Sequence, residues 1–486
     1  MSNLSDLLPS GGGQNIVDFT ATGSLSSGQA VALKSDGTVS AISPIVGSTT
    51  TFDAAAQSNT INSAIFDPDT NKIVIAYRDV GDDKKGKCVI GTVSGSSISF
   101  GTPVTFETSQ TDGQYSAAYD EAADKVVVAY QLSSNSHLVI IIGTVSGDSI
   151  SFGSKFESSR SASYSDAVYD ANAGKVLLAY TDSLNNAYPT LSLVNISGTT
   201  PTVSGTTVAV SSAATEVQLS YDTTASKTAL CITGTDARIL GYVLTNSSSS
   251  ITVGSGTVLS AGATEANSVY IPDINRHVVI YHNSSTLYGT YVIFEVSGTS
   301  IANQTGETTY NSVSQGYIQS TIAYDTNADK VFIVYRKDST TKNAVARTGT
   351  ASTTALTLGD EITLNSATNS NNTAGIQATF DSNANRIVCS QGQDQSANTD
   401  ANAFVFDING GPANTDFIGL TNAAISNGAT GKVNVKGSIN SKQSSLTIGS
   451  DYYVQADGSV STTSTSPAVK IGQAVTATTI NLMDLT

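Results

Sequence analysis

Residues 119–130 read YDEAADKVVVAY: an aromatic residue and an aspartate, a polar turn, and an apolar run that begins with lysine. The same pattern recurs along the chain at intervals of 49–56 residues. The aspartate position is occupied in turn by Asp67, Asp120, Asp170, Asp222, Ile271, Asp325 and Asp381. A repeat of about 50 residues that contains several short strands is typical of β-propeller blades. The sequence therefore predicts an all-β protein whose centre is a seven-bladed β-propeller.

Each repeat divides into two hairpins, so we expect four-stranded blades. In the second repeat the expected strands are residues 116–119, 125–130, 138–145 and 149–152. Polar and glycine-containing segments join them, which is the composition that tight hairpin turns require. The propeller is predicted to span residues 46–411.

The seventh repeat lacks an outer strand. After its expected third strand, residues 403–408, the chain turns away at Gly410-Gly411-Pro412. Residues 48–52, which precede the first repeat, resemble the outer strands of the other repeats. We expect this N-terminal strand to close the last blade, because an open ring would expose two strand edges.

The two ends outside the propeller share a motif. Residues 24–40 follow the pattern SLxxGxxVxLxxDGxVS, and residues 445–461 follow SLxxGxxYxVxxDGxVS. Each copy predicts a strand, an Asp-Gly turn and a second strand. We expect an N-terminal β module at residues 14–45 and a C-terminal β module at residues 412–486, packed together as a small sandwich or barrel.

The first 13 residues differ from the rest of the N-terminal segment. Leu4, Leu7 and Leu8 precede Pro9 and three consecutive glycines, so this leader is an apolar peptide on a flexible tether. We interpret it as a docking arm for a neighbouring subunit, and a disordered tail is the alternative.

Composition excludes several partners. The net charge of −16 and the pI of about 4.4 argue against nucleic acid and anionic membrane surfaces, because phosphate binding needs basic patches. No segment approaches 18 apolar residues, so we expect no membrane insertion, and the N-terminus lacks a signal-peptide pattern. We therefore expect synthesis in a host cytoplasm. Cys231 and Cys389 lie in apolar runs and are expected to be buried, without disulfides.

The repeated aspartates do not form a catalytic pair. One per blade at the same turn would spread them around a ring, whereas glycoside hydrolysis needs two convergent carboxyl groups. We expect each to accept backbone N–H groups in its turn, with an additional ion pair to the lysine or arginine five residues later. The sequence also lacks tryptophan and the Ser-x-Asp-x-Gly-x-Thr-Trp boxes of sialidase-type propellers. We expect no enzymatic activity, no cofactor and no metal.

Variable connections at one end of the blades are the expected binding region, because binding residues concentrate in loops on a uniform scaffold. These connections are residues 78–87, 181–189, 282–288, 336–342 and 391–402. Our candidates for surface-ligand contacts are Asp79, Asp82, Asp83, Tyr115, Tyr188, His282, Tyr288, Arg336, Asp338 and Asp394. Ordinary surface loops are the alternative. The first three aspartates could hold calcium, but Lys84, Lys85 and Lys87 favour a solvated loop.

Both ends resemble a known family. The leader NLSDLLP at residues 3–9, the runs FIGL at 417–420 and YYVQxDG at 452–458, and SPxVKxG at 466–472 are similar to structural proteins of marine tailed bacteriophages. This resemblance implies a virion location, other virion proteins as partners, and no catalytic residues to carry over. It also agrees with our expectation that the protein forms homo-oligomers through its two chain ends.

The leading hypothesis is a non-enzymatic virion structural protein, such as a fibre, knob or decoration subunit. It would display the propeller on the particle, where the propeller could attach to a host-surface glycan. The alternative is a carbohydrate-binding lectin, and the third hypothesis is a glycoside hydrolase.

Overall fold

The chain divides into two compact units. In the computed structural model, unit 1 comprises Met1–Ile45 and Asp407–Thr486, and unit 2 comprises Val46–Phe406. The structure describes residues 15–23, 25–34, 36–42, 45–54, 62–313, 320–337, 344–359, 361–364, 373–393, 401–408, 416–455, 458–464 and 469–483. Within these residues the regular structure is antiparallel β-sheet with two short 3₁₀ helices, η2 (Ser183–Asn185) and η3 (Pro272–Ile274). No helix among them is long and apolar enough to cross a membrane.

Unit 2 contains seven antiparallel sheets in its described part. The first strands are β6 (Asn62–Asp67), β11 (Thr111–Asp120), β16 (Ser165–Asp170), β20 (Ala214–Asp222), β25 (Ala263–Ile271), β30 (Thr321–Asp325) and β35 (Thr373–Asp381). The second strands are β7 (Lys72–Asp79), β12 (Lys125–Leu132), β17 (Lys175–Asp182), β21 (Lys227–Gly234), β26 (Arg276–Asn283), β31 (Lys330–Arg336) and β36 (Arg386–Gln393). The third strands are β8 (Lys85–Ser94), β13 (His137–Ser146), β18 (Tyr188–Ser197), β22 (Ile239–Asn246), β27 (Gly289–Ser297), β32 (Ala344–Ala351) and β37 (Ala401–Asp407).

The outer strand is mostly split into two pieces that both pair with the third strand, which differs from the single outer strand we expected. The pieces are β9 (Ser97–Phe100) with β10 (Val104–Glu107), β14 (Ser149–Phe152) with β15 (Phe156–Ser161), β23 (Ile251–Val253) with β24 (Thr257–Ser260), β28 (Ser300–Ala302) with β29 (Thr308–Asn311), and β33 (Leu356–Leu358) with β34 (Ile362–Thr363). In the third sheet the outer strand β19 (Thr200–Val208) is continuous, and in the seventh the outer pieces are β4 (Ile45–Val46) and β5 (Thr50–Asp53).

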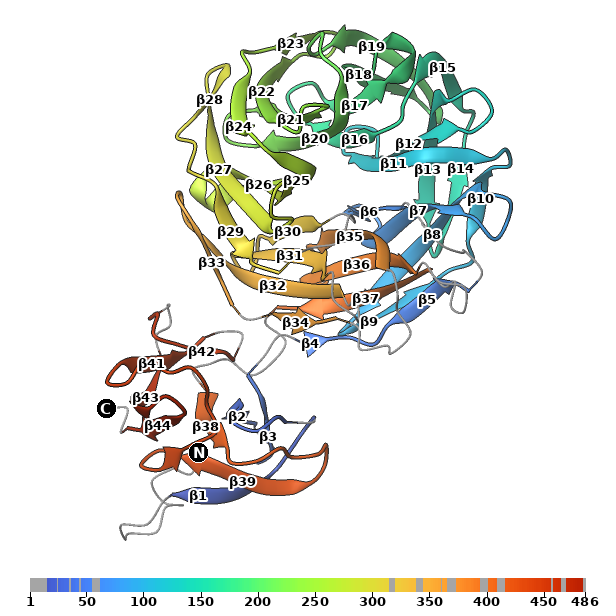
Figure 1. Ribbon diagram of the computed structural model, residues 1–486. Helices are drawn as coiled ribbons and strands as arrows, with labels where there is room; N and C mark the ends of the chain where they lie inside the picture. The colour runs from blue at the N-terminus through green and yellow to red at the C-terminus, as the bar shows by residue number, and fades with distance from the viewer. Residues whose placement is uncertain are drawn as a thin grey trace. The chain divides into compact units, whose positions relative to one another are not determined.

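The seven sheets are arranged around a common centre, with their first strands innermost (Figure 1). Each first strand contacts the first strand of the next sheet, from β6 to β11 and onward to β35, and β35 contacts β6. The seventh sheet combines both ends of unit 2, because β5 pairs with β37 in the register Ala401↔Asp53 and Ala403↔Thr50.

The turn between first and second strands is built as the sequence predicts. Asp120 Oδ1 accepts the backbone N–H groups of Ala122 and Ala123 at 3.0 Å. The turn aspartates Asp67, Asp170, Asp222, Asp325 and Asp381 accept turn N–H groups in the same way. In the fifth sheet, where Ile271 replaces the aspartate, the 3₁₀ helix η3 makes the turn instead.

The expected ion pair between the turn aspartate and the lysine five residues later does not form in the first sheet. Lys72 Nζ instead donates to Thr92 Oγ1 and to Asp148 of the next sheet, both at 2.7 Å. Lys227 likewise donates to Thr245 of its own sheet, at 2.8 Å. The long lysine stem crosses the strand face and reaches the third strand, so these lysines join strands and sheets.

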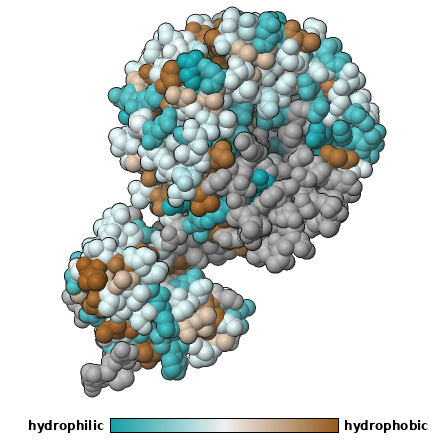
Figure 2. All heavy atoms as spheres, in the orientation of Figure 1, coloured by the Kyte–Doolittle hydropathy of each residue, from teal (hydrophilic) through white to brown (hydrophobic). Residues whose placement is uncertain are grey.

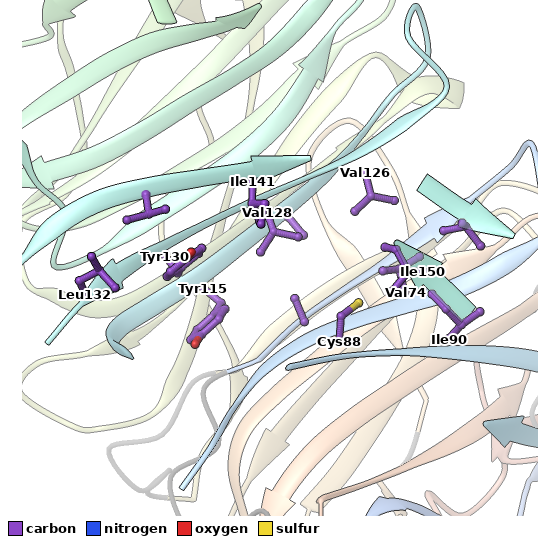
Figure 3. Close-up of a cluster of buried hydrophobic side chains, with 14 residues drawn as sticks. Val74, Cys88, Ile90, Tyr115, Val126, Val128, Tyr130, Leu132, Ile141 and Ile150 are labelled. Atoms are coloured by element: carbon purple, nitrogen blue, oxygen red, sulfur yellow. The ribbon is translucent and has the colours of Figure 1, made fainter. Parts of the chain in front are cut away.

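Hydrophobic cores lie between neighbouring sheets. In Figure 3, Val74 and Cys88 of the first sheet pack with Val128, Tyr130 and Ile150 of the second. The second strands read as continuous apolar runs because both of their faces are buried, as in sheets covered on both sides. All three cysteines are buried and unpaired, as predicted for Cys231 and Cys389.

A glycine in the outer strand marks close contact with the next sheet. The N–H of Gly101 donates to Ile90 O at 2.9 Å, and a Cβ at Gly101 would overlap the carbonyl oxygen of Asp148 in the adjacent turn. Gly47 of the seventh sheet is placed in the same way: its N–H donates to Val405 O at 2.8 Å, and a Cβ would overlap Ser96 O. Only a residue without a side chain allows the two backbones to approach so closely.

Unit 1 consists of two five-stranded sheets. One has the order β1-β39-β38-β2-β3, and the other has the order β40-β44-β43-β41-β42. The strands are β1 (Ile16–Thr20), β2 (Ala30–Leu33), β3 (Val39–Ala41), β38 (Phe417–Thr421), β39 (Thr430–Val435), β40 (Ile439–Asn440), β41 (Asp451–Val454), β42 (Val460–Ser461), β43 (Val469–Thr476) and β44 (Thr479–Leu482).

The shared motif of the two ends forms matching hairpins in unit 1. β2 pairs with β3 and β41 pairs with β42, and each turn closes with a glycine N–H that donates at 3.0 Å, Gly37 to Lys34 O and Gly458 to Gln455 O. The predicted strand, turn and strand are therefore confirmed in both copies. Two hydrophobic clusters each join residues of both chain ends.

Candidate functional site

The loop between β7 and β8 carries the three aspartates that the sequence singled out. Asp79 is buried, so it is not the surface residue we expected, and Lys87 Nζ donates to it at 2.5 Å. Lys85 and Lys87 also pair with Asp82, at 2.8 and 3.2 Å, and these hydrogen bonds hold the pKa of Asp82 below its usual range. Asp83 is exposed and accepts from Gln110 at 3.0 Å. The chain's own lysines therefore occupy the carboxylates that calcium would need.

The three candidate tyrosines do not form one binding surface. Tyr115 was expected on the surface, but it is buried, because its ring stacks on Tyr130 with centroids 5.9 Å apart. Tyr188 begins β18, opposite Asp182, and is half-buried. Tyr288 is half-buried and belongs to a different sheet, next to β27. Only Tyr188 and Tyr288 retain exposed ring surface.

His282 and Arg336 were expected in surface loops, but both are buried at the ends of second strands. His282 Nδ1 lies 3.2 Å from a carboxylate oxygen of Glu265. Glu265 lies in a β-bulge of β25 with φ of +55°, and such bulges re-aim side chains. Glu216, in the preceding sheet, accepts the N–H of Ala266 at 3.0 Å, so its carboxyl group reaches the same bulge. We call Glu216, Glu265, His282 and Arg336 the acidic cluster.

The acidic cluster changes the proton affinity of its carboxyl groups. Burial, and then the neighbouring charge of Glu216, raise the pKa of Glu265 to about 8, although Arg336 opposes this. Burial also raises the pKa of Glu216, against the hydrogen bonds that it accepts. At neutral pH Glu265 is therefore mostly protonated, so the cluster can both donate and accept hydrogen bonds. Tyr164 is an exposed aromatic residue near the cluster. Burial raises the pKa of its hydroxyl, and the charges of Glu216 and Glu265 raise that pKa further.

The sequence interpretation missed Glu216, Glu265 and Tyr164. All three occupy the position six residues before the turn position of their repeat. A search for ionisable residues at equivalent repeat positions would have found the two glutamates in adjacent sheets. A search confined to the variable connections could not, because both residues lie inside first strands.

A small polar cavity of about 60 Å³ lies among the first strands. Polar side chains from all seven first strands or the residues beside them line it. Two of these side chains bind the next sheet: Ser63 Oγ accepts Ala117 N–H at 3.0 Å, and Asp166 Oδ2 accepts Leu219 N–H at 2.7 Å. Burial raises the pKa of Asp166 to about 6. The volume suits a few water molecules and no larger ligand. These contacts join sheets.

A larger surface cavity, of about 610 Å³, lies beside β29 and the sixth sheet. Its lining is mostly polar and comprises Thr309, Tyr310, Asn311, Ser312, Val313, Arg347 and Glu361. We call it the Arg347 cavity. Glu361 Oε1 accepts the hydroxyl of Tyr335 at 2.6 Å, and Lys337 pairs with its other oxygen. Tyr310 packs edge-on against Tyr335 with ring centroids 5.6 Å apart, so the floor of the cavity is firmly packed.

Several candidates lie outside the described residues. These are Asp338, Asp394 and the leader residues Leu4, Leu7 and Leu8. Figure 2 shows that the coloured surface of unit 2 on the visible face is mostly pale or hydrophilic, with hydrophobic residues in small separate spots. A surface of this kind suits polar ligands better than a broad apolar partner.

No protein-family model and no curated protein matches the sequence. Solved structures do share the fold. The BP39L lectin from Burkholderia pseudomallei aligns with a TM-score of 0.55 at 8% identity, over 72% of this chain and 98% of that chain. AofleA from Arthrobotrys oligospora aligns with a TM-score of 0.41 at 10% identity, over 71% of this chain and 97% of that chain. The β-propeller domain of Cps50 (Swd1) from Myceliophteria thermophila aligns with a TM-score of 0.47 at 8% identity, over 74% of this chain and 99% of that chain. The BP39L alignment shows that the two chains share a fold, and the described residues of this chain form antiparallel β-sheets.

Proposed function

We propose that unit 2 is a closed seven-bladed β-propeller that binds carbohydrate without transforming it. Three contacts support closure of the ring: β35 packs on β6, β5 pairs with β37, and Gly47 approaches the first sheet as Gly101 approaches the second. A closed ring is rigid, so loops and cavities on it are preorganised for a ligand.

The observation that carries the proposed function is the Arg347 cavity. Its volume of about 610 Å³ falls in the range of roughly 300–1,000 Å³ that is usual for small-ligand sites. Its lining offers hydroxyl, amide, guanidinium and carboxylate groups, which can pair with the closely spaced hydroxyls of a sugar. Val313, an exposed apolar side chain at the same cavity, can contact the apolar face of a sugar ring.

The likeness to the BP39L lectin supports this choice over a purely structural role. Identity of 8% shows a shared fold and does not carry a ligand from one protein to the other. The proposal therefore depends on the cavity of this chain and its own residues.

A glycan array probed with the full chain tests the proposal. We expect binding to a defined set of glycans, and we expect Ser312→Trp to abolish it by filling the cavity. Asp83→Asn is the matched control, because Asp83 is an exposed polar residue elsewhere and its loss should leave binding unchanged. Absence of binding at high protein concentration, or binding that survives Ser312→Trp, would refute the proposal.

Binding without turnover is the second part of the proposal. Among the described residues, the acidic cluster brings together two glutamates whose pKa values are raised by burial, so it is the site at which we test for hydrolysis. We expect array-positive glycans to remain intact after prolonged incubation. Hydrolysis that Glu265→Gln abolishes would instead identify a glycosidase.

A second candidate function is that of a virion structural subunit of a marine phage, anchored through unit 1. Exposed apolar side chains on unit 1 favour an anchoring role: Ile448 is 67% exposed and Val475 is 45% exposed. Burial of such residues against other copies or other virion proteins would be favourable. Mass spectrometry of purified particles tests the location, and a strictly monomeric chain in light scattering would argue against self-association.

A further inference from the structure

Arg347 lines the cavity with a positive charge that the described residues leave without a carboxylate partner. Its Nε–H donates to Gly359 O at 2.8 Å, one Nη2–H donates to Leu358 O at 3.4 Å, and Nη1–H donates to Tyr310 O. These carbonyls use three of the five N–H groups of the guanidinium, so two remain for a ligand.

The acidic side chain of the cavity does not supply the missing partner. Both carboxylate oxygens of Glu361 are occupied, one by the Tyr335 hydroxyl at 2.6 Å and the other by Lys337. Glu361 and Lys337 therefore neutralise each other. The remaining lining residues are uncharged, which leaves the cavity with one net positive charge. This is unusual in a chain of net charge −16 that contains only 23 lysines and arginines.

We propose that the Arg347 cavity selects acidic sugars and that the carboxylate of the sugar pairs with Arg347. This inference rests on the proposed carbohydrate-binding function and names its ligand class. A planar guanidinium matches a planar carboxylate better than it matches a hydroxyl, and the ion pair strengthens each hydrogen bond. The hydroxyl groups of Thr309 and Ser312, which are exposed, then contact the ring hydroxyls.

The position of the guanidinium favours selectivity. Three backbone carbonyls from two sheets hold Arg347, so the side chain loses little freedom when a ligand arrives. A flexible surface lysine would have to be ordered by the ligand and would discriminate less.

Matched sugar pairs test the inference. Methyl β-D-glucuronide is compared with methyl β-D-glucoside, and methyl α-D-galacturonide with methyl α-D-galactoside, by titration calorimetry on the full chain. Within at least one pair we expect the acidic sugar to bind about tenfold more tightly. Its affinity should fall several-fold between 50 and 500 mM NaCl, whereas that of the neutral sugar should not.

Two variants locate the effect. Arg347→Gln should remove the acidic preference, and Arg347→Lys should retain part of it, with folding verified by thermal melts. The salt titration of the parent protein gives a second readout if either variant is unstable. Equal affinity within both pairs would overturn the acidic preference but leave carbohydrate binding intact. Tighter binding of a 6-sulfated glucoside than of the uronides would also overturn it, and absence of binding to any glycan would overturn both proposals.

Discussion

The two ends of the sheets in unit 2 differ in what their side chains do. At the end with the turns between first and second strands, an aspartate accepts turn N–H groups in sheet after sheet. Elsewhere in unit 2, three separate regions contain charged side chains in three different arrangements. In the loop of Asp79, lysines pair with the carboxylates. In the acidic cluster, burial raises the pKa of both glutamates. The charge of Arg347 has no carboxylate partner among the described residues.

This difference distinguishes residues that stabilise the fold from residues that are available to a ligand. A contact repeated in six of the seven sheets stabilises the fold, and its loss should lower stability without changing ligand preference. A charge that occurs in one sheet and has no carboxylate partner among the described residues has no such explanation. The predictions below test this separation, beginning with the largest expected effect.

Asp170→Ala should be the most damaging change. Besides its turn, Asp170 accepts hydrogen bonds from Thr228 Oγ1 at 2.8 Å and Asn246 Nδ2 at 2.6 Å, both in the next sheet. Alanine would leave these buried donors unpaired, at a cost of about 2–4 kcal/mol. Urea unfolding measures this loss. Asp170→Asn keeps part of the acceptor geometry and should cost less, so equal small effects of the two variants would refute the assignment.

Lys87→Met should destabilise the protein by about 2 kcal/mol. It would leave Asp79, which is 2% exposed, without its cation in the protein interior. Chemical denaturation measures this loss. Lys85→Met is the matched control, because its partner Asp82 is more exposed and still pairs with Lys87.

Glu265→Gln should stabilise the protein at alkaline pH by about 1–2 kcal/mol and have little effect at pH 4. The folded pKa of about 8 exceeds the usual value of 4.5, so the folded state binds the proton more tightly than the unfolded state. The parent protein should therefore lose stability as pH rises from about 4.5 to 8. Glutamine stays neutral and removes this slope. Thermal melts across this range measure it, and an unchanged slope would contradict the assigned environment.

Asp83→Asn should change stability by less than about 0.5 kcal/mol. The side chain is exposed and its contact is with an exposed glutamine, Gln110. Asparagine also tolerates the positive φ of 59° at this position. A large effect in thermal melts would show that this loop has a role that its contacts do not reveal.

The strands and turns could be predicted because they depend on local sequence. An apolar run such as 125–130 and an aspartate before it determine a hairpin almost independently of the rest of the chain, and the Asp-Gly turns of unit 1 do the same. The split of the outer strands could not be predicted from local sequence, because the break occurs where Gly101 meets a turn of the next sheet.

The sites were harder to predict for the same reason. Glu216 and Glu265 are ordinary strand residues until two sheets are placed side by side and a bulge turns one of them. The Arg347 cavity joins residues 309–313 with residues 347 and 361 of the following sheet. The sequence placed His282 and Arg336 in exposed connections, but both are buried, because burial depends on the neighbouring sheets.

The pairing of β5 with β37 has a consequence for biosynthesis. Asp53 leaves the ribosome roughly 350 residues before its partner Ala401, a delay of roughly 20–70 s at typical translation rates. During this time β5 must remain unpaired in a crowded cell. Its sequence, TTFD, contains a single large apolar residue and a charge, so it is a poor seed for aggregation. The sequence of β5 therefore limits the risk of aggregation before its partner strand is made.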